Sequence, residues 1–153
     1  MLVEDFEDTS YVWTVNSAGG WARSNTAART GTWSFKAPTT AHNASSSLTV
    51  TVPAGASSVQ FWYRVSSESG YDFFRFSVGA SPQLEESGDV DWTLSPVYAL
   101  GAATQLTFTY AKDGSQSVGS DTVWIDDVAF VVPVPHLLQP VRSAAASMRA
   151  SRW

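Results

Sequence analysis

The chain has 153 residues, of which 44% are hydrophobic, 15% charged and 13% aromatic. This length suits one domain with a sizeable core, and the low charge and high aromatic content exclude a disordered chain. The formal net charge of -5 argues against a general nucleic-acid-binding protein. The sequence has no run of about 18 apolar residues, which is the length that a membrane-spanning helix needs. The absence of cysteine excludes disulfides and thiolate metal sites.

The N-terminal segment Met1-Leu2-Val3-Glu4-Asp5-Phe6 has neither the basic region nor the apolar stretch of a signal peptide. We therefore expect a complete gene product that starts at Met1 and is made in the cytoplasm without an export signal of its own.

Apolar and polar side chains alternate through most of residues 1–132, which is the pattern of half-buried strands. The clearest runs are residues 47–52, 59–65, 73–78 and 106–110. Turn-forming sequences rich in glycine, proline and aspartate separate these runs, and no segment has a convincing helical period. The pattern predicts an all-β domain over residues 1–132, built as an antiparallel two-sheet jelly-roll β-sandwich.

The last predicted strand changes its inward parity part of the way along. Val123 and Ile125 occupy odd positions, whereas Val128 and Phe130 occupy even positions. The change falls at Asp126-Asp127 and predicts a β-bulge there.

Residues 133–153 differ from the domain that precedes them. All 14 acidic residues lie in residues 1–132, whereas the tail is punctuated by proline and carries only basic charge. We expect an extended or partly helical tail that anchors the domain on a neighbouring subunit rather than a frayed end. The residues expected to make this contact are Leu137, Leu138, Val141, Arg142, Met148, Arg149, Arg152 and Trp153.

Five motifs occur in order along the domain. They are EDFED at residues 4–8, FWYRVSSESGYD at 61–72, SGDVDW at 87–92, YAKDGS at 110–115 and GSDTVWIDDV at 119–128. Together they resemble the MAM-like, concanavalin-type jelly-roll modules of bacterial surface and secreted proteins and of phage structural proteins. The resemblance covers about residues 3–132. It implies adhesion, glycan contact or assembly, and it does not imply catalysis.

The same resemblance implies a structural Ca²⁺ between the first and last strands. Its ligands would be Asp5, Glu7 and Asp127, with backbone carbonyls and waters completing the six to eight oxygens that calcium takes. The alternative is that these acids lie apart, solvated or hydrogen-bonded to the backbone.

Two other charged groups are candidate sites. A calcium loop that starts at Asp113 would have Val118 and Trp124 where an EF-hand needs glycine and glutamate, so the segment from Asp113 to Asp121 is interpreted as a turn. A second group flanks the hairpin at Ser69-Gly70 and is interpreted either as cross-strand ion pairs or as a polar face that binds sugar hydroxyls. Its members are Glu68, Asp72, Arg64 and Arg75.

Tryptophan is abundant, with seven residues in the chain. Trp62 and Trp124 have the parity opposite to the aliphatic residues of their strands, which points them outward. Because tryptophan faces stack on sugar rings, these two, together with Glu68 and Asp72, are the candidate glycan-binding residues. The alternative is that a loop or a neighbouring subunit covers both rings.

An enzymatic function is not expected. The two histidines, His42 and His136, are not placed for a nucleophilic triad. The acids between Glu85 and Asp91 crowd a segment that is typical of an exposed turn, although glycosidases do use paired carboxylates.

These observations predict a phage virion structural protein, either a head decoration protein or a minor tail protein. It would be oligomeric in the particle, display the jelly roll on the surface and dock on neighbouring virion subunits through residues 133–153. The alternative is a carbohydrate-binding or adhesion module that recognises cell-surface polysaccharide.

Overall fold

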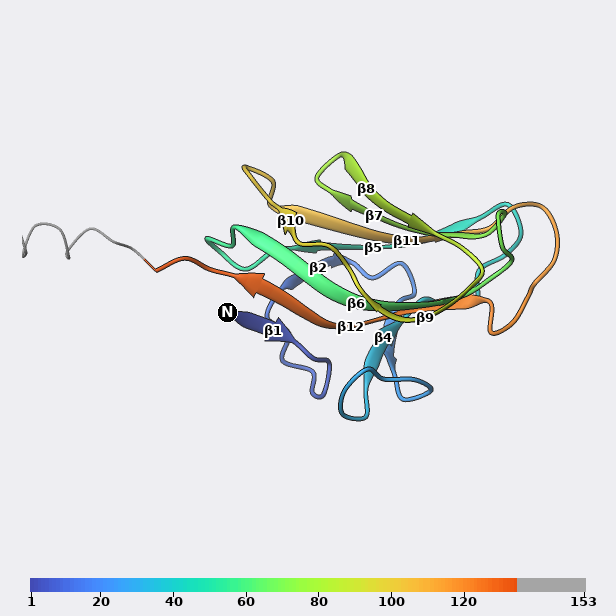
Figure 1. Ribbon diagram of the computed structural model, residues 1–153, viewed down its shortest axis with the longest axis horizontal. Coiled ribbons are helices and arrows are strands. Elements are labelled where there is room, and N and C mark those ends of the chain that lie inside the picture. Colours follow the sequence, from blue (N-terminus) through green and yellow to red (C-terminus); the bar gives the residue numbers. More distant parts are fainter. Residues whose placement is uncertain (135–153) are drawn as a thin grey trace, which may run out of the picture.

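The computed structural model describes residues 1–134, which form twelve strands in two antiparallel sheets (Figure 1). No helix occurs among these described residues, and hence none that could cross a membrane. The strands are β1 (Leu2–Glu4), β2 (Thr14–Ser17), β3 (Ala22–Ser24), β4 (Ser34–Lys36), β5 (Ser45–Thr51), β6 (Ser58–Ser66), β7 (Phe73–Val78), β8 (Ser81–Glu86), β9 (Asp89–Leu94), β10 (Tyr98–Ala99), β11 (Gln105–Ala111) and β12 (Thr122–Val131).

The first sheet is organised around its two longest strands, β6 and β12, which pair along most of their length. On its other side β6 pairs with β10 near its start and with β9 near its end. In the same way β12 pairs first with β4 and then with β1, while β3 extends the sheet beyond β4. The second sheet has the order β2-β5-β11-β7-β8. The predicted all-β, two-sheet sandwich is therefore confirmed.

The core lies between the sheets and consists largely of aromatic rings. Burial alternates strictly along β6, and every second residue of β7 and β11 is buried, as the period-2 pattern predicts. Phe61 of β6 lies at the centre, with its ring centroid 4.7 Å from that of Phe76 and 5.3 Å from that of Phe108. Phe61 thus joins the first sheet to β7 and to the central strand β11 of the second.

The predicted β-bulge in the last strand is confirmed. The register between β12 and β6 shifts between Asp126 and Ala129, and Asp127 has a left-handed φ of 46°. The extra residue lets Ile125 and Val128 both bury their side chains completely, which explains the change of parity in the sequence.

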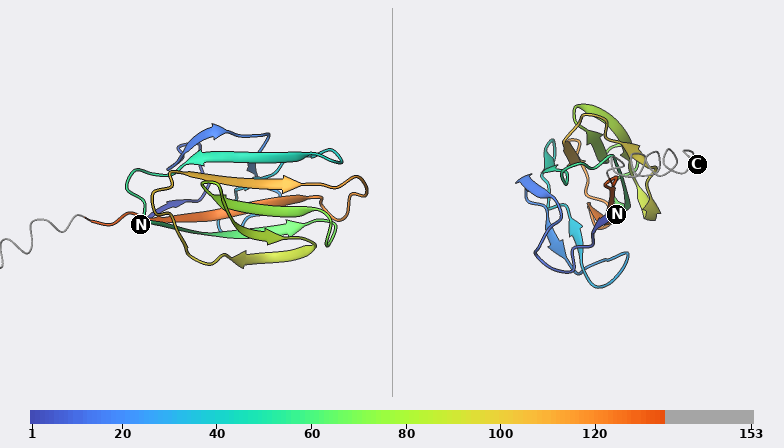
Figure 2. Two further views of the ribbon diagram at one scale, coloured as in Figure 1. Left: turned by 90° about the horizontal axis from the view of Figure 1, so that it is seen from above. Right: turned by 90° about the vertical axis from the view of Figure 1, so that its left-hand side faces the viewer.

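The start of β1 and the end of β12 lie at the same end of the molecule, because the two strands pair antiparallel with Leu2 opposite Phe130 (Figure 2). The tail predicted over residues 133–153 lies outside the described residues from position 135 onward, and so do all of its proposed anchoring side chains.

Candidate functional site

The solvent-facing side of the second sheet is polar. The outward positions of β5 and β11 carry serine and threonine, and the hydroxyl groups of Ser47 and Thr109 hydrogen-bond across the two strands at 2.8 Å. Thr49 and Thr107 form the adjacent outward pair. This surface offers many hydroxyl groups and no large apolar patch on these two strands.

A hollow of about 480 Å³ opens on this sheet over β7 and β8. Its lining residues are Arg75, Ser77, Pro82, Gln83, Leu84 and Glu85. Arg75 Nε lies 2.6 Å from Glu85 Oε2, and both side chains are about half exposed, at 47% and 54%. The Arg75 guanidinium also lies over the ring of Phe73, 4.9 Å from its centroid. The hollow therefore combines donors and acceptors that remain accessible to solvent with a ring that holds the arginine in place.

The loop between β3 and β4, residues 25–33, covers part of the outward side of the first sheet. Arg29 from this loop lies over the ring of Trp62, with its guanidinium carbon 3.9 Å from the ring centroid. The indole of Trp124 donates a hydrogen bond to Thr26 Oγ1 at 3.0 Å, and Trp124 is only 4% exposed. The two rings do point away from the core. The expectation that Trp124 is an exposed sugar-stacking surface is nevertheless wrong, because the loop and the side chains stacked on the ring cover it.

Cations stack on the tryptophans of this side. Arg64 and Lys36 lie 5.4 and 5.9 Å from the Trp124 ring centroid, and Arg23 lies 4.3 Å from that of Trp33. The Arg64 guanidinium thus lies over the Trp124 ring, while Arg75 pairs with Glu85 on the neighbouring strand. The cross-strand ion pairs predicted between these arginines and Glu68 or Asp72 are therefore not formed.

Asp126 at the bulge holds the covering loop in place. Its Oδ2 accepts the backbone N–H groups of Arg29 and Thr30 at 2.7 and 3.3 Å, and its Oδ1 accepts the N–H of Asp127 at 2.8 Å. Burial raises the pKa of Asp126 to about 7, against the opposing effect of the Arg29 N–H bond. The sequence located the bulge but did not indicate this role, because the partners of Asp126 lie almost a hundred residues away.

Two of the three predicted metal ligands, Glu7 and Asp127, bind the same loop. Glu7 Oε1 accepts the N–H groups of Thr32 and Trp33 at 3.0 and 2.8 Å. Asp127 accepts the hydroxyl of Thr30 at 2.8 Å, and Asp5 accepts the N–H of Glu7 at 3.1 Å. Each acid is thus hydrogen-bonded to the protein.

The charges of these acids act on one another. Burial raises the pKa of the Asp127 carboxyl, and the carboxylates of Asp5 and Glu7 raise it further. Every donor atom in the group is a hard oxygen of the kind that calcium prefers, but these three carboxylates do not converge within 4.8 Å of one another as Glu68, Asp72 and Asp113 do.

Glu4 is a further structural acid that sequence reasoning missed. It is buried, and its two oxygens accept the N–H groups of Phe6 and Val12 at 2.9 and 2.8 Å. Burial raises the pKa of this carboxyl despite those two bonds. These two hydrogen bonds to Glu4 hold both ends of the segment between β1 and β2 in place.

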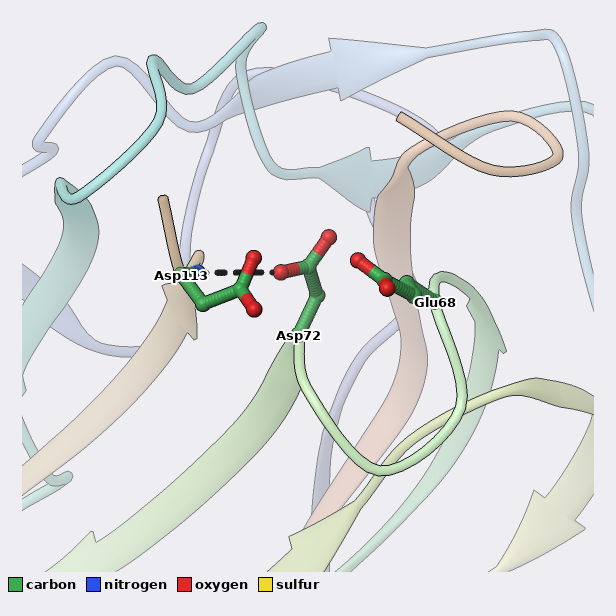
Figure 3. Close-up of side chains that lie close together, drawn as sticks. All are labelled: Glu68, Asp72 and Asp113. Carbon is green, nitrogen blue, oxygen red and sulfur yellow. Dashed lines mark hydrogen bonds between the residues drawn. The ribbon is translucent and has the colours of Figure 1, made fainter. Parts of the chain in front are cut away.

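The remaining glycan candidates, Glu68 and Asp72, lie between β6 and β7 at one end of the sandwich, away from the hollow. Their carboxylates face Asp113 from the segment between β11 and β12 (Figure 3). Asp113 also caps its own turn by accepting the N–H of Ser115 at 3.1 Å, as predicted for this segment.

The sequence matches no protein-family model and no curated protein. Among solved structures, the K2 cleaved adhesin domain of Lys-gingipain superposes with a TM-score of 0.60 at 16% identity, covering 86% of this chain and 98% of that chain. A xylan-binding domain from carbohydrate-binding family 22 gives 0.47 at 15% identity, covering 88% and 96% of the two chains. The module TmCBM61 in complex with β-1,4-galactotriose gives 0.43 at 18% identity, covering 79% and 88%.

The main functional prediction is not supported. The similar structure that superposes over most of both chains is an adhesin domain and not a virion component, so the expectation of a head decoration or minor tail protein is wrong. The prediction relied on the tail and on the start of the chain rather than on a surface of the domain. The described chain is a β-sandwich module of the jelly-roll type.

Proposed function

We propose that this protein is a non-catalytic carbohydrate-binding module that holds a polysaccharide in the hollow over β7 and β8. The observation that carries the proposal is the exposed Arg75–Glu85 pair within that hollow, 2.6 Å apart, with Gln83 and Ser77 beside it. The likeness to an adhesin domain across nearly its whole length supports a binding role. We also propose that the domain is a MAM-like module, the kind that its sequence motifs resemble.

The chemistry of the hollow suits sugar hydroxyls, which donate and accept hydrogen bonds at the same time. Arginine only donates, an ionised glutamate only accepts, and glutamine does both. An exposed ion pair contributes at most about 1 kcal/mol to stability, so Arg75 and Glu85 can exchange bonds with a ligand at little cost to the fold. The partner that we propose for this surface is a cell-surface polysaccharide.

Replacing Arg75 with alanine is expected to weaken polysaccharide binding about tenfold or more, because charge-assisted hydrogen bonds to the ligand are lost. Affinity electrophoresis against a panel of polysaccharides, followed by calorimetry on those that bind, measures the change. Trp62→Ala is the matched control on the other sheet, and it should bind as the unaltered protein does because Arg29 already covers that ring.

Two outcomes would contradict the proposed site. If Trp62→Ala loses binding while Arg75→Ala retains it, the ligand contacts the first sheet instead. If the unaltered protein binds nothing across a broad panel, the carbohydrate-binding function itself is wrong.

We further propose that Asp5, Glu7 and Asp127 bind a structural Ca²⁺ that ties the first and last strands to the loop at residues 25–33. The register of β1 and β12, in which Glu4 lies opposite Val128, brings Asp5 close to Asp127 and supports this proposal. Saturating Ca²⁺ is expected to raise the melting temperature by about 5 °C, and the rise should be smaller in Asp127→Asn. Differential scanning calorimetry with and without a chelator makes the comparison, and an equal rise in both proteins would show that these acids do not bind the ion.

A further inference from the structure

Three carboxylates from distant parts of the sequence meet at one end of the sandwich. Glu68 and Asp72 come from the turn between β6 and β7, and Asp113 follows β11. Each offers an oxygen, and these oxygens all lie within 4.8 Å of one another. Figure 3 shows Asp72 between the other two side chains, with the carboxylates facing one another.

The central carboxylate, Asp72, is fully buried and only partly satisfied. Its side chain is 0% exposed, and its Oδ1 accepts the N–H of Asp113 at 3.0 Å. Its Oδ2 has no hydrogen-bond donor, and neither has Oε2 of Glu68, which is also shielded from solvent. A buried carboxylate oxygen without a donor is costly, so two in one cluster indicate that the described side chains supply too little positive charge there.

The one ammonium group nearby among the described residues is already engaged. Lys112 Nζ lies 2.6 Å from Asp121 Oδ2 and 2.9 Å from Ser117 Oγ, but 3.8 Å from Asp72 Oδ2. Four carboxylates therefore share one lysine. Burial raises the pKa of the Glu68 carboxyl, Asp113 and Asp72 raise it further, and Lys112 and His42 act in the opposite direction.

We propose that Glu68, Asp72 and Asp113 bind a calcium ion. All the donors are hard oxygens, which calcium prefers, and ligands on opposite sides of an ion with bonds of about 2.3–2.6 Å are about 5 Å apart. The observed spacing fits that distance, and the orphaned oxygens of Asp72 and Glu68 would become ligands. Backbone carbonyls and waters would complete the coordination shell.

In the calcium loop that the sequence excluded at Asp113–Asp121, all ligands would come from one continuous segment. The ligands proposed here come from two separate segments. Asp121 is instead the ion-pair partner of Lys112, and the other two ligands come from a turn more than forty residues earlier. The ion would join the β6–β7 turn to the β11–β12 loop. It is independent of the hollow over β7 and β8 and of the acids around Asp127.

The test is calcium titration calorimetry on chelator-treated full-length protein carrying Asp127→Asn, which removes the contribution of the other acidic group. Asparagine suits that position because it tolerates a left-handed φ. We expect one Ca²⁺ per chain in this background, and at least tenfold weaker binding when Glu68→Gln or Asp113→Asn is added. Asp91→Asn, an exposed acid on β9, is the matched control and should leave the affinity unchanged.

Circular dichroism of each chelator-treated variant checks that it is folded, and Glu68→Gln keeps the size of the side chain. The absence of calcium binding in the Asp127→Asn background, or unchanged affinity in both the Glu68→Gln and Asp113→Asn proteins, would overturn the proposal. Equal affinity for Mg²⁺ in a parallel titration would overturn the assignment to calcium.

Discussion

Replacing Asp126 with alanine is expected to lower the free energy of unfolding by about 3 kcal/mol or more. The substitution removes the acceptor of three backbone N–H groups, those of Arg29, Thr30 and Asp127. Each buried donor left without a partner costs about 1–3 kcal/mol, and the shortest of these bonds, from Arg29, is 2.7 Å long. Denaturation in urea, followed by circular dichroism, measures the loss.

The same substitution should also release the covering loop, because Asp126 is its main attachment to β12. Trp124 and Trp62 would then become accessible, which increased quenching of tryptophan fluorescence by acrylamide would detect. Asp91→Ala removes an exposed carboxylate and should change stability by no more than about 0.5 kcal/mol. A loss below about 1 kcal/mol for Asp126→Ala would mean that the loop is held by other contacts.

Replacing Phe61 with alanine is expected to cost about 3–5 kcal/mol, the usual range for a buried aromatic residue. Phe61 is fully buried, and its ring packs at 4.7 Å from Phe76 and 5.3 Å from Phe108 on the opposing sheet. The cavity would therefore open where the two sheets meet, and flanking rings of this size cannot fill it without moving the strands. Thermal and urea denaturation provide the measurement.

Phe73 on β7 is the matched control, because it points outward beneath Arg75 rather than into the core. Phe73→Ala should cost less than half as much as Phe61→Ala. Equal losses for the two variants would show that the interior is loosely packed around Phe61.

The sandwich was predictable from the sequence because its signals are local. Alternation along residues 59–65 and 73–78 marks which side chains face the core, and the turns between strands carry glycine and aspartate. The bulge was predictable for the same reason, since a change of parity within one strand is visible without knowing its neighbours.

The sites were not predictable to the same degree, because they depend on contacts between distant segments. Parity pointed Trp124 outward correctly, but whether a loop covers an outward ring depends on residues nearly a hundred positions away, such as Thr26. The partner of Arg75 was likewise misjudged, because the pairing of β7 with β8 and not the nearest turn decides it. Asp113 lies close to Glu68 and Asp72 because β11 pairs with β7, and this pairing is not visible in the local sequence.

The antiparallel pairing of β1 with β12 also determines how the domain would respond to mechanical force. Tension applied between the start of β1 and the end of β12 acts first on the Leu2–Phe130 pair, because both strands leave the sheet at that end. The hydrogen bonds of β1 would then break one after another, as in a zipper, instead of resisting together in shear. β1 has only three residues, so Leu2 and Val3 would peel away at low force, and the first firm resistance would come at buried Glu4 and Phe6.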